Sequence, residues 1–283
     1  MNNKMKLTAL MLSLVLLVTL FAGCGSQSSA ASETPAEAAS DGPVLSKIKA
    51  AGKLVVGTEA QYAPYEFKDL NANFVGCDMF LAQKIADALG VKLEIVDMSF
   101  DGIIPAVQAG QVDLGIAAFT NTPERAEVID FSALYETSMQ YLVVAADKVD
   151  TYTSKESLAG LKVGAQKGTI QSQLITSALP DSQLFELDKY PELALEVSNG
   201  NIAGLVVDSA VGDSIVANSN GALAVAHFEF SAEEASFGKS VVIAKGNEDL
   251  VAAVDAVIAG VLEDGSYQAA YDEAVALAAE MGV

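Results

Sequence analysis

The chain has 283 residues and a formal net charge of −21, from 37 acidic and 16 basic residues. This charge makes nucleic acid and anionic membrane surfaces unfavourable partners for the folded part, although a local basic site can still lie inside an acidic protein. The length allows one large domain or two of ordinary size, and either can bury a substantial core.

Residues 1–23 have the pattern of a secretory signal. Lys4 and Lys6 come before an almost uninterrupted apolar run from Leu7 to Leu20, and small residues precede Cys24. A positive segment, an apolar segment and small residues at a cleavage site predict export rather than a membrane-spanning helix.

Residues 24–43 are predicted to be a lipidated cysteine followed by a flexible tether. Phe21-Ala22-Gly23-Cys24 resembles a lipobox, which implies that Cys24 receives lipid and becomes the mature N-terminus. The stretch 25–43 is rich in Ser, Ala, Glu and Pro and has no apolar periodicity, which is typical of a tether. The alternative is a plain signal peptide cut near Cys24.

Only two cysteines are present, Cys24 and Cys77. If Cys24 carries lipid, no internal disulfide can form. We therefore expect Cys77 to be a small buried hydrophobic residue without chemistry.

From Lys53 onward the apolar pattern alternates between strands and helices. It predicts strands over 54–58, 92–96 and 112–116, and helices over 81–89 and 103–108. This alternation indicates a mainly parallel sheet covered by helices, in which ligands bind at the carboxyl ends of strands. The stretches 59–62 and 117–120 both follow such strand ends.

A second series begins at Tyr141. It predicts strands over 141–145, 161–165 and 202–207, a returning strand over 238–244, and helices over 190–197, 248–263 and 266–280. A chain that leaves one α/β unit, builds another and returns forms two lobes joined by two crossovers. Clefts between such lobes are favoured sites for small ligands.

The strand ending near Ile116 leads to a loop and a new helix. Thr122 predicts an N-cap and Pro123 the first helical position, so Arg125 falls in the first turn, where the helix dipole disfavours a cation. Arg125 therefore needs a negative partner. The local residues leave two alternatives open, which are a bound carboxylate and the nearby acids Glu124, Glu127 and Asp130.

No cofactor or metal site is predicted. His227 is the only histidine and is expected to be structural or exposed. The sequence contains no histidine and cysteine cluster, no glycine-rich phosphate loop and no motif supporting a Ser-His-Asp set.

Six segments together resemble the extracellular solute-binding proteins of ABC importers, specifically the polar amino acid family. They are residues 57–67, 75–78, 110–114, 122–132, 162–169 and 263–267. The resemblance implies an α/β, two-lobed, periplasmic-binding-protein-like (type II) fold with two crossover hinge strands. Lobe 1 is expected over 44–140 plus 239–283, and lobe 2 over 141–238.

The resemblance also implies how a ligand amino acid is held. Arg125 is expected to bind its α-carboxylate, since a planar guanidinium can make two charge-assisted bonds to one carboxylate. Asp208 is expected to receive its α-ammonium, and nearby Asp213 is a competitor for that role. The remaining contacts come from the Ala117 carbonyl, the Ala118 N–H, the Thr120 side chain and the segment Gly168, Thr169 and Ile170.

Four residues are expected to surround the ligand side chain. Tyr62 and Phe100 match the aromatic positions that enclose it, with ordinary core packing as the alternative. Glu59 and Gln166 would favour a basic or amide side chain, as in arginine, lysine or glutamine. The alternative for Glu59 is a solvated charge at a strand end.

These expectations describe a binding protein rather than an enzyme. It would lie outside the cytoplasm, anchored to the membrane bilayer through Cys24, and deliver an amino acid to ABC permease subunits. One alternative is an enzyme of the cyclohexadienyl dehydratase type, for which Glu59 is the candidate general acid. Another is a sensory module that passes ligand occupancy to a receptor.

Overall fold

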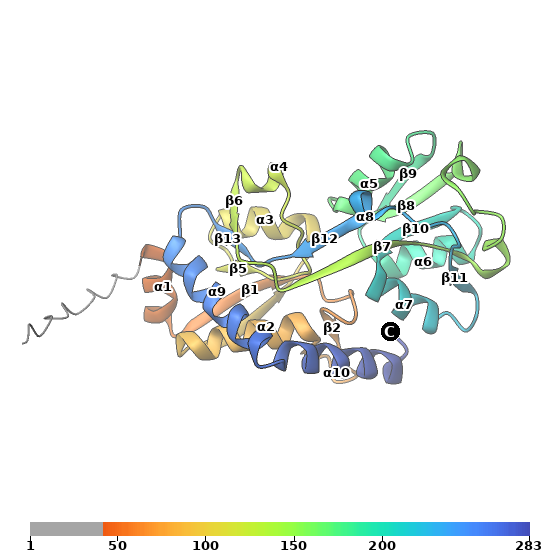
Figure 1. Ribbon diagram of the computed structural model, residues 1–283. Coiled ribbons are helices and arrows are strands. Elements are labelled where there is room, and N and C mark those ends of the chain that lie inside the picture. Colours follow the sequence, from red (N-terminus) through yellow and green to blue (C-terminus); the bar gives the residue numbers. More distant parts are fainter. Residues whose placement is uncertain (1–41) are drawn as a thin grey trace, which may run out of the picture. The chain divides into compact units, whose positions relative to one another are not determined.

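The computed structural model describes residues 42–283, and Figure 1 shows two groups of elements. The predicted signal, Cys24 and the tether as far as residue 41 lie outside the described residues. Helix α1 begins at Pro43, the last residue of the predicted segment 24–43, whose extent stays a prediction.

The first group is built from residues 43–131. Its elements are α1 (Pro43–Ala51), β1 (Lys53–Thr58), β2 (Phe67–Lys68), β3 (Phe74–Val75), α2 (Cys77–Leu89), β4 (Lys92–Asp97), α3 (Phe100–Gln108), β5 (Leu114–Gly115), α4 (Pro123–Ala126) and β6 (Ile129–Phe131). The last three elements of the chain belong with it, namely β13 (Val242–Ala244), α9 (Glu248–Glu263) and α10 (Ser266–Met281).

The second group lies between them in sequence. Its elements are β7 (Glu136–Ala145), the 3-10 helices η1 (Ala146–Lys148) and η2 (Lys155–Leu158), β8 (Lys162–Gln166), α5 (Ile170–Ala178), β9 (Gln183–Leu187), α6 (Tyr190–Ser198), β10 (Gly204–Asp208), α7 (Ser209–Ala217), β11 (Leu223–Val225), α8 (Ala232–Ala235) and β12 (Ser236–Lys239).

Each group has a mixed sheet at its centre. The first has the strand order β4-β1-β5-β13-β6, and β1 is parallel to both β4 and β5, whereas β13 is antiparallel to its neighbours. The second has the order β11-β7-β10-β8-β9, in which β8 pairs parallel with β9 and β10, whereas β7 pairs antiparallel with β10 and β11. By strand direction both sheets are mainly parallel, as expected, because only β13 in the first and β7 in the second run against the other strands.

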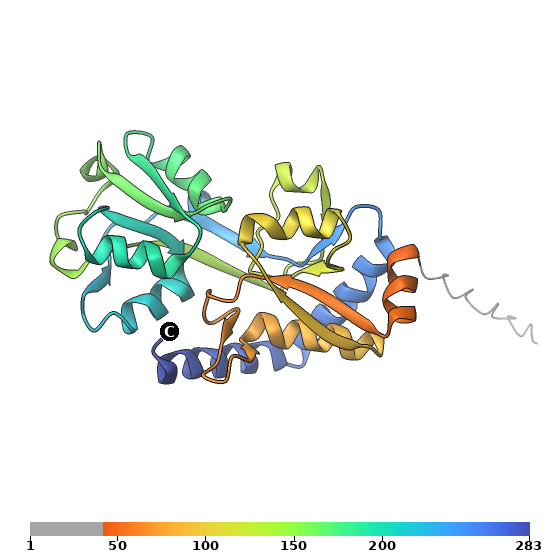
Figure 2. The same cartoon turned by 180° about the vertical axis from the view of Figure 1, so that it is seen from behind.

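Two strands run between the lobes, and the views from front and back agree on this arrangement (Figures 1 and 2). They are β7 and β12, which pair antiparallel with Lys239 opposite Glu136. The predicted single strand over 238–244 is instead two strands, β12 and β13. The proposed lobe boundary after residue 140 lies inside β7, the other lies near the end of β12, and both stay predictions.

The long helices near the end of the chain match their prediction closely. α9 covers 248–263 as expected, and α10 extends one residue beyond 280. They are separated at Gly265, whose φ of 73° is left-handed and therefore favours glycine. The last residue, Val283, reaches the second lobe, where its carbonyl accepts bonds from Ser214 and Asn218 of α7 at 2.6 Å.

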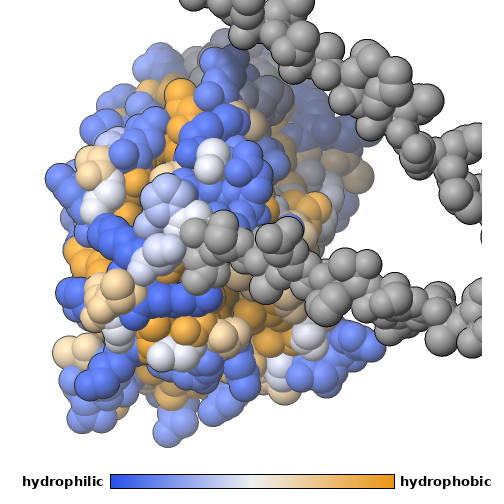
Figure 3. Space-filling view, turned by 90° about the vertical axis from the view of Figure 1, so that its left-hand side faces the viewer, coloured by the Kyte–Doolittle hydropathy of each residue, from blue (hydrophilic) through white to orange (hydrophobic). Residues whose placement is uncertain are grey.

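Buried apolar side chains join the two lobes into one body. One cluster includes residues of both sheets, such as Val56 and Leu205. Cys77 is fully buried, as predicted, and its Sγ lies 3.5 Å from the Tyr267 hydroxyl. On the end of the first lobe seen in Figure 3, hydrophilic residues cover most of the visible surface, in keeping with the high charge of the chain.

Gly76 generates a prediction about stability. It has a φ of 118°, and a Cβ there would lie 2.1 Å from the Tyr65 carbonyl oxygen, which accepts the N–H of Asp78 at 2.9 Å. Gly76→Ala is expected to lower the free energy of unfolding by about 3 kcal/mol or more, because backbone must shift to relieve the clash. Urea unfolding measures the change.

The matched control is Gly260→Ala, at an exposed position of helix α9 where a Cβ meets nothing within 4 Å. This change should raise the free energy of unfolding by roughly 0.5–1 kcal/mol. Equal stability of the two variants would contradict the steric account of Gly76.

Candidate functional site

A small cavity between the lobes collects side chains from both of them. Its lining includes eleven of the twelve ligand-site residues predicted from the sequence: Glu59, Tyr62, Phe100, Ala117, Ala118, Thr120, Arg125, Gln166, Thr169, Ile170 and Asp208. The twelfth, Gly168, touches Arg125 through its carbonyl oxygen. The cavity measures about 20 Å³, enough for about one water molecule, so an amino acid fits only after lobes or side chains move.

The strand ends bring these residues together. Glu59 follows β1 and Ala117 follows β5 in the first sheet, while Gln166 ends β8 and Asp208 ends β10 in the second. All four strands present their carboxyl ends to the cavity, which is where open α/β sheets place their ligands.

Arg125 occupies the junction between the lobes. Thr122 caps α4 by accepting the Arg125 N–H, as its position in the sequence predicted. The guanidinium donates from Nη1 to the Thr120 carbonyl at 2.8 Å and from Nη2 to the Gly168 carbonyl at 3.0 Å. Burial lowers the pKa of Arg125 to about 10, so the group is still charged at neutral pH.

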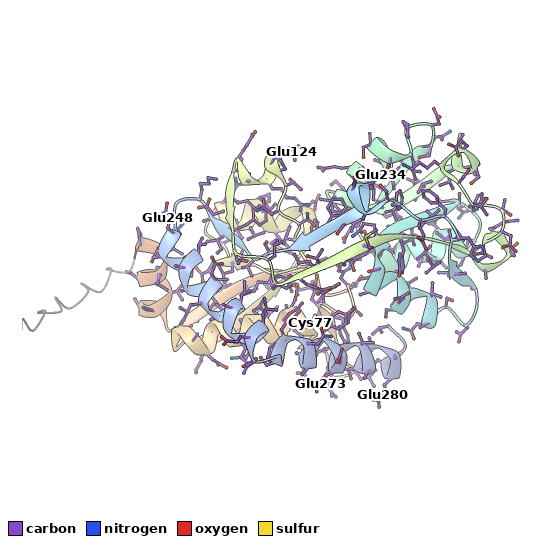
Figure 4. The ribbon with its side chains drawn as sticks, in the orientation of Figure 1. Cys77, Glu124, Glu234, Glu248, Glu273 and Glu280 are labelled. Atoms are coloured by element: carbon purple, nitrogen blue, oxygen red, sulfur yellow. The ribbon has the colours of Figure 1, made fainter. Side chains whose placement is uncertain are left out.

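Aromatic rings face this guanidinium, but no acid pairs with it. The rings of Phe100 and Phe119 lie 5.5 and 5.4 Å from its central carbon. Among residues 42–283, no carboxylate forms an ion pair with Arg125: Asp130 pairs with Lys245 at 3.1 Å, and the side chains of Glu124 (Figure 4) and Glu127 belong to exposed residues. The local acids therefore leave its positive charge unpaired.

Glu59 and Gln166 meet at another part of the cavity. Gln166 Nε2 lies 3.4 Å from Glu59 Oε2 and donates to the Asp188 carbonyl at 2.8 Å. Glu59 is only 4% exposed, which excludes the alternative of a solvated strand-end charge. Burial raises the pKa of Glu59 to about 7, although the Gln166 bond and the charge of Lys189 oppose the shift. Its carboxyl can therefore gain or lose a proton near neutral pH.

The two predicted aromatic residues both line the cavity, and each is supported by another ring. Tyr62 packs on Tyr190 with ring centroids 5.1 Å apart, and Phe100 stacks on Phe119 at 4.5 Å. These contacts fix the ring positions. Tyr62 and Phe100 therefore line the cavity and also pack against other rings. Each of the two alternatives from the sequence describes part of their environment.

The backbone donors near Arg125 differ in availability. The Ala118 N–H, expected to reach a ligand carboxylate, donates instead to Asp78 Oδ2 at 2.7 Å, so it is not free in the structure. Ala118 has a φ of 47°. Ile170 is the first residue of α5, where a backbone N–H has no acceptor within the helix. The Thr169 side chain caps that helix by accepting the Ser172 N–H.

Asp208 has protein donors on both carboxylate oxygens. Oδ1 lies 3.1 Å from the Tyr65 hydroxyl and 3.2 Å from the Ala210 nitrogen. Oδ2 accepts from the Ser138 hydroxyl and from Lys239 Nζ, the latter at 2.9 Å. Protein donors thus already compete for the carboxylate that was predicted to receive a ligand ammonium, most of all at Oδ2. The competitor Asp213 is exposed and does not line the cavity.

Sequence reasoning missed several lining residues, and Lys239 is the most consequential. The others are Glu66, Ser138, Gln140, Gln171 and Phe237. Lys239 is 2% exposed although lysine is rarely buried without a partner. A lysine at the start of the apolar run 239–244 was the available signal.

Glu66 adds a buried acid to the cavity wall. It is 1% exposed, and burial followed by the neighbouring Asp78 and Glu59 raises the pKa of Glu66 well above its ordinary value. The surroundings of Glu66 therefore favour its neutral form over its charged form.

The described part of the chain offers little else in the way of chemistry. Within residues 42–283, no group of three His, Cys, Asp or Glu side chains could hold a metal ion, and no helix is long and apolar enough to cross a membrane. His227 is exposed and lies 3.3 Å from Asp150 through Nδ1.

Known proteins resemble this chain over most of its length. The L-cystine-binding protein TcyJ of Escherichia coli K12 is 30% identical over 229 residues, which are 81% of this chain and 85% of that protein. An amino acid ABC transporter substrate-binding protein, AbpA of Streptococcus pneumoniae bound to L-arginine, has a TM-score of 0.79 and 35% identity, covering 82% of this chain and 98% of that one.

A third similar structure is the ancestral amino acid-binding protein AncCDT-1, described as a precursor of cyclohexadienyl dehydratase. Its TM-score is 0.74 and its identity 34%, covering 81% of this chain and 98% of that one. The fold is the two-lobed, periplasmic-binding-protein-like fold of type II. The model of the bacterial extracellular solute-binding proteins, family 3, matches residues 54–275. The chain belongs to this family, and it is an amino acid-binding protein of an ABC transporter rather than an enzyme.

Proposed function

We propose that the protein binds an L-amino acid with a basic or amide side chain between its two lobes and delivers it to ABC permease subunits. The observation that carries the proposal is the Arg125 guanidinium, which lines the cavity and bonds only to carbonyl oxygens among the described residues. A half-buried cation without an anionic partner favours binding of an anion.

The ligand carboxylate is assigned to Arg125. Its planar fork can make two charge-assisted bonds to one carboxylate, and the Phe100 and Phe119 rings hold the fork in place. The Thr120 side chain and the Ile170 N–H are the additional donors in this proposal, from the first and second lobe respectively.

The ligand side chain is assigned to Glu59 and Gln166. A buried carboxyl with a pKa of about 7 can ionise in the presence of a guanidinium or ammonium group, or donate a hydrogen bond to an amide when protonated. The amide of Gln166 serves either ligand. Arginine, lysine and glutamine therefore fit the site better than an apolar amino acid does.

Binding between lobes couples occupancy to closure. Arg125, in the first lobe, already bonds to Gly168, in the second, and the cavity is too small to admit an amino acid as it stands. The proposed lobes, 44–140 with 239–283 and 141–238, separate to admit the ligand. A ligand that contacts both lobes then shifts the equilibrium toward closure.

We also propose that a lipid on Cys24 anchors the protein outside the cytoplasm, on the strength of the lipobox-like sequence. Native protein is expected to enter the detergent phase in a Triton X-114 partition, whereas Cys24→Ala protein stays in the aqueous phase. Native protein found in the aqueous phase would argue for a plain signal peptide.

Arg125 gives a direct test of the carboxylate site. Arg125→Ala is expected to weaken binding of the cognate amino acid by roughly 2–5 kcal/mol, because the ligand carboxylate loses its charged partner. Arg125→Lys should recover only part of that loss, because an ammonium lacks the planar fork. Isothermal titration calorimetry with L-arginine and L-glutamine on protein freed of ligand measures both.

Lys53→Ala is the matched control, because Lys53 is an exposed cation paired with Glu94 at 2.8 Å outside the cavity. Its affinity should equal that of the native protein. If the Arg125→Ala variant binds the amino acid as tightly as the native protein does, the ligand carboxylate must bind elsewhere.

Glu59 predicts a pH dependence that separates cationic from neutral ligands. Its charged surroundings are Lys189, Asp97 and Lys68, beside the neutral Gln166. L-arginine should bind about 10-fold more tightly at pH 8 than at pH 6, because only ionised Glu59 attracts the guanidinium and its pKa is near 7. L-glutamine should show a smaller change.

Titration in buffers of different ionisation enthalpy should show proton release when L-arginine binds at pH 7. Glu59→Gln should abolish both the release and the pH dependence. The assignment of Glu59 fails if that variant keeps the native pH profile.

A further inference from the structure

The ammonium group of Lys239 bonds to Asp208, the carboxylate that the family resemblance assigns to the ligand α-ammonium. Nζ of Lys239 lies 2.9 Å from Asp208 Oδ2, and also bonds to Ser138. Both charged side chains are almost completely buried, with 3% and 4% of their surfaces exposed. Lys239 also lines the cavity, so its charge faces the same space as Asp208.

The fold holds Lys239 in this place. It is the last residue of β12 and lies opposite Glu136 of β7, and it also bridges to Thr120. Both strands connect the lobes. The lysine backbone is therefore fixed by the crossover strands rather than by a surface loop.

Protein donors already occupy most of the acceptor positions of Asp208. An ionised carboxylate offers about four lone-pair positions. Three donors bond to Asp208, namely Ala210 at Oδ1 and Ser138 and Lys239 at Oδ2. The Tyr65 hydroxyl lies 3.1 Å from Oδ1, but its one proton is closer to Glu136 Oε1, at 2.7 Å. A ligand ammonium at Oδ2 would have to displace Ser138 or Lys239.

The donor hardest to displace is Lys239. Burial opposes its charge, but attraction to Asp208 and Glu136 outweighs this and raises the pKa of Lys239, so it stays protonated. Glu136 Oε1 lies 3.6 Å from Nζ, and the hydroxyls of Tyr65 and Tyr267 bond to Glu136 at 2.7 and 3.0 Å. Removing the ammonium from this cluster would leave the buried Asp208 and the partly buried Glu136 without a cation.

A ligand ammonium placed beside Lys239 would also meet a like charge. Two cations a few ångströms apart in a buried site repel each other, and here the carboxylates are already matched. A free α-ammonium group on the ligand therefore adds little to the binding affinity at this position.

We propose that Lys239 supplies the cation of the α-ammonium subsite, so that the protein binds carboxylates with a basic or amide end whether or not they carry a free α-ammonium. The inference rests on the proposed function, because it keeps the carboxylate at Arg125 and the side chain at Glu59 and Gln166. The additional ligand class comprises ω-guanidino and ω-amido carboxylic acids.

The test compares L-arginine with 5-guanidinopentanoate, which is arginine without its α-amine. Calorimetry on native protein freed of ligand should give affinities within about 10-fold of each other. In Lys239→Met, Asp208 gains a free acceptor position, so the preference for arginine over the analogue should grow by roughly 30-fold or more.

Because Lys239→Met leaves the buried Asp208 and the partly buried Glu136 without their cation, a second variant keeps the test valid if the first fails to fold. Lys239→Gln combined with Glu136→Gln removes one charge of each sign and should raise the arginine preference in the same direction. Lys245→Gln, on an exposed lysine paired with Asp130, is the control and should leave the native ratio unchanged. Thermal melting establishes that each variant is folded.

The outcomes separate the two proposals. If L-arginine binds native protein while the analogue is more than about 100-fold weaker, the inference is overturned and the proposed function stands. The inference is also overturned if the ratio of the affinities for L-arginine and the analogue is unchanged in both Lys239 variants. If neither L-arginine, L-lysine, L-glutamine nor the analogue binds, the proposed function fails and the inference falls with it.

Discussion

The positive charge of Arg125 at the junction of the lobes is the constraint on which the site depends. Its guanidinium is held by the carbonyls of Thr120 and Gly168 and by two aromatic rings, and no described carboxylate neutralises it. Carbonyl dipoles orient such a group but do not cancel its charge. In the proposed function an anionic ligand completes this balance, and because Gly168 is assigned to the other lobe, the same group would link ligand binding to lobe closure.

The other charges of the cavity are balanced within the protein. Lys239 and Asp208 form a buried pair, Glu136 lies behind them, and Glu66 favours its neutral form. Glu59 is the one lining acid whose pKa of about 7 lets its charge follow the ligand. The site thus divides into a fixed cation, an internally paired region and an adaptable carboxyl, which explains how a strongly acidic protein can recognise a carboxylate.

Local patterns were sufficient for elements with clear start and stop signals, and insufficient where distant strands meet. α9 and α10 follow from their apolar spacing and the Asp264-Gly265 break, and Thr122 follows from its capping position. The antiparallel strands in each sheet and the division of 238–244 into two strands depend on pairing with residues that are distant in sequence. Lys239 was missed for the same reason, since its partners Asp208 and Glu136 are remote in sequence. Family resemblance supplied the candidate site residues, but it did not reveal that Asp78 takes the Ala118 N–H or that Lys239 takes Asp208.

The most direct test of the account is a crystal structure of the protein with L-arginine bound. We expect the ligand carboxylate on the Arg125 guanidinium, its side chain beside Glu59 and Gln166, and Lys239 still bonded to Asp208. A ligand whose carboxylate lies away from Arg125 would contradict the central claim.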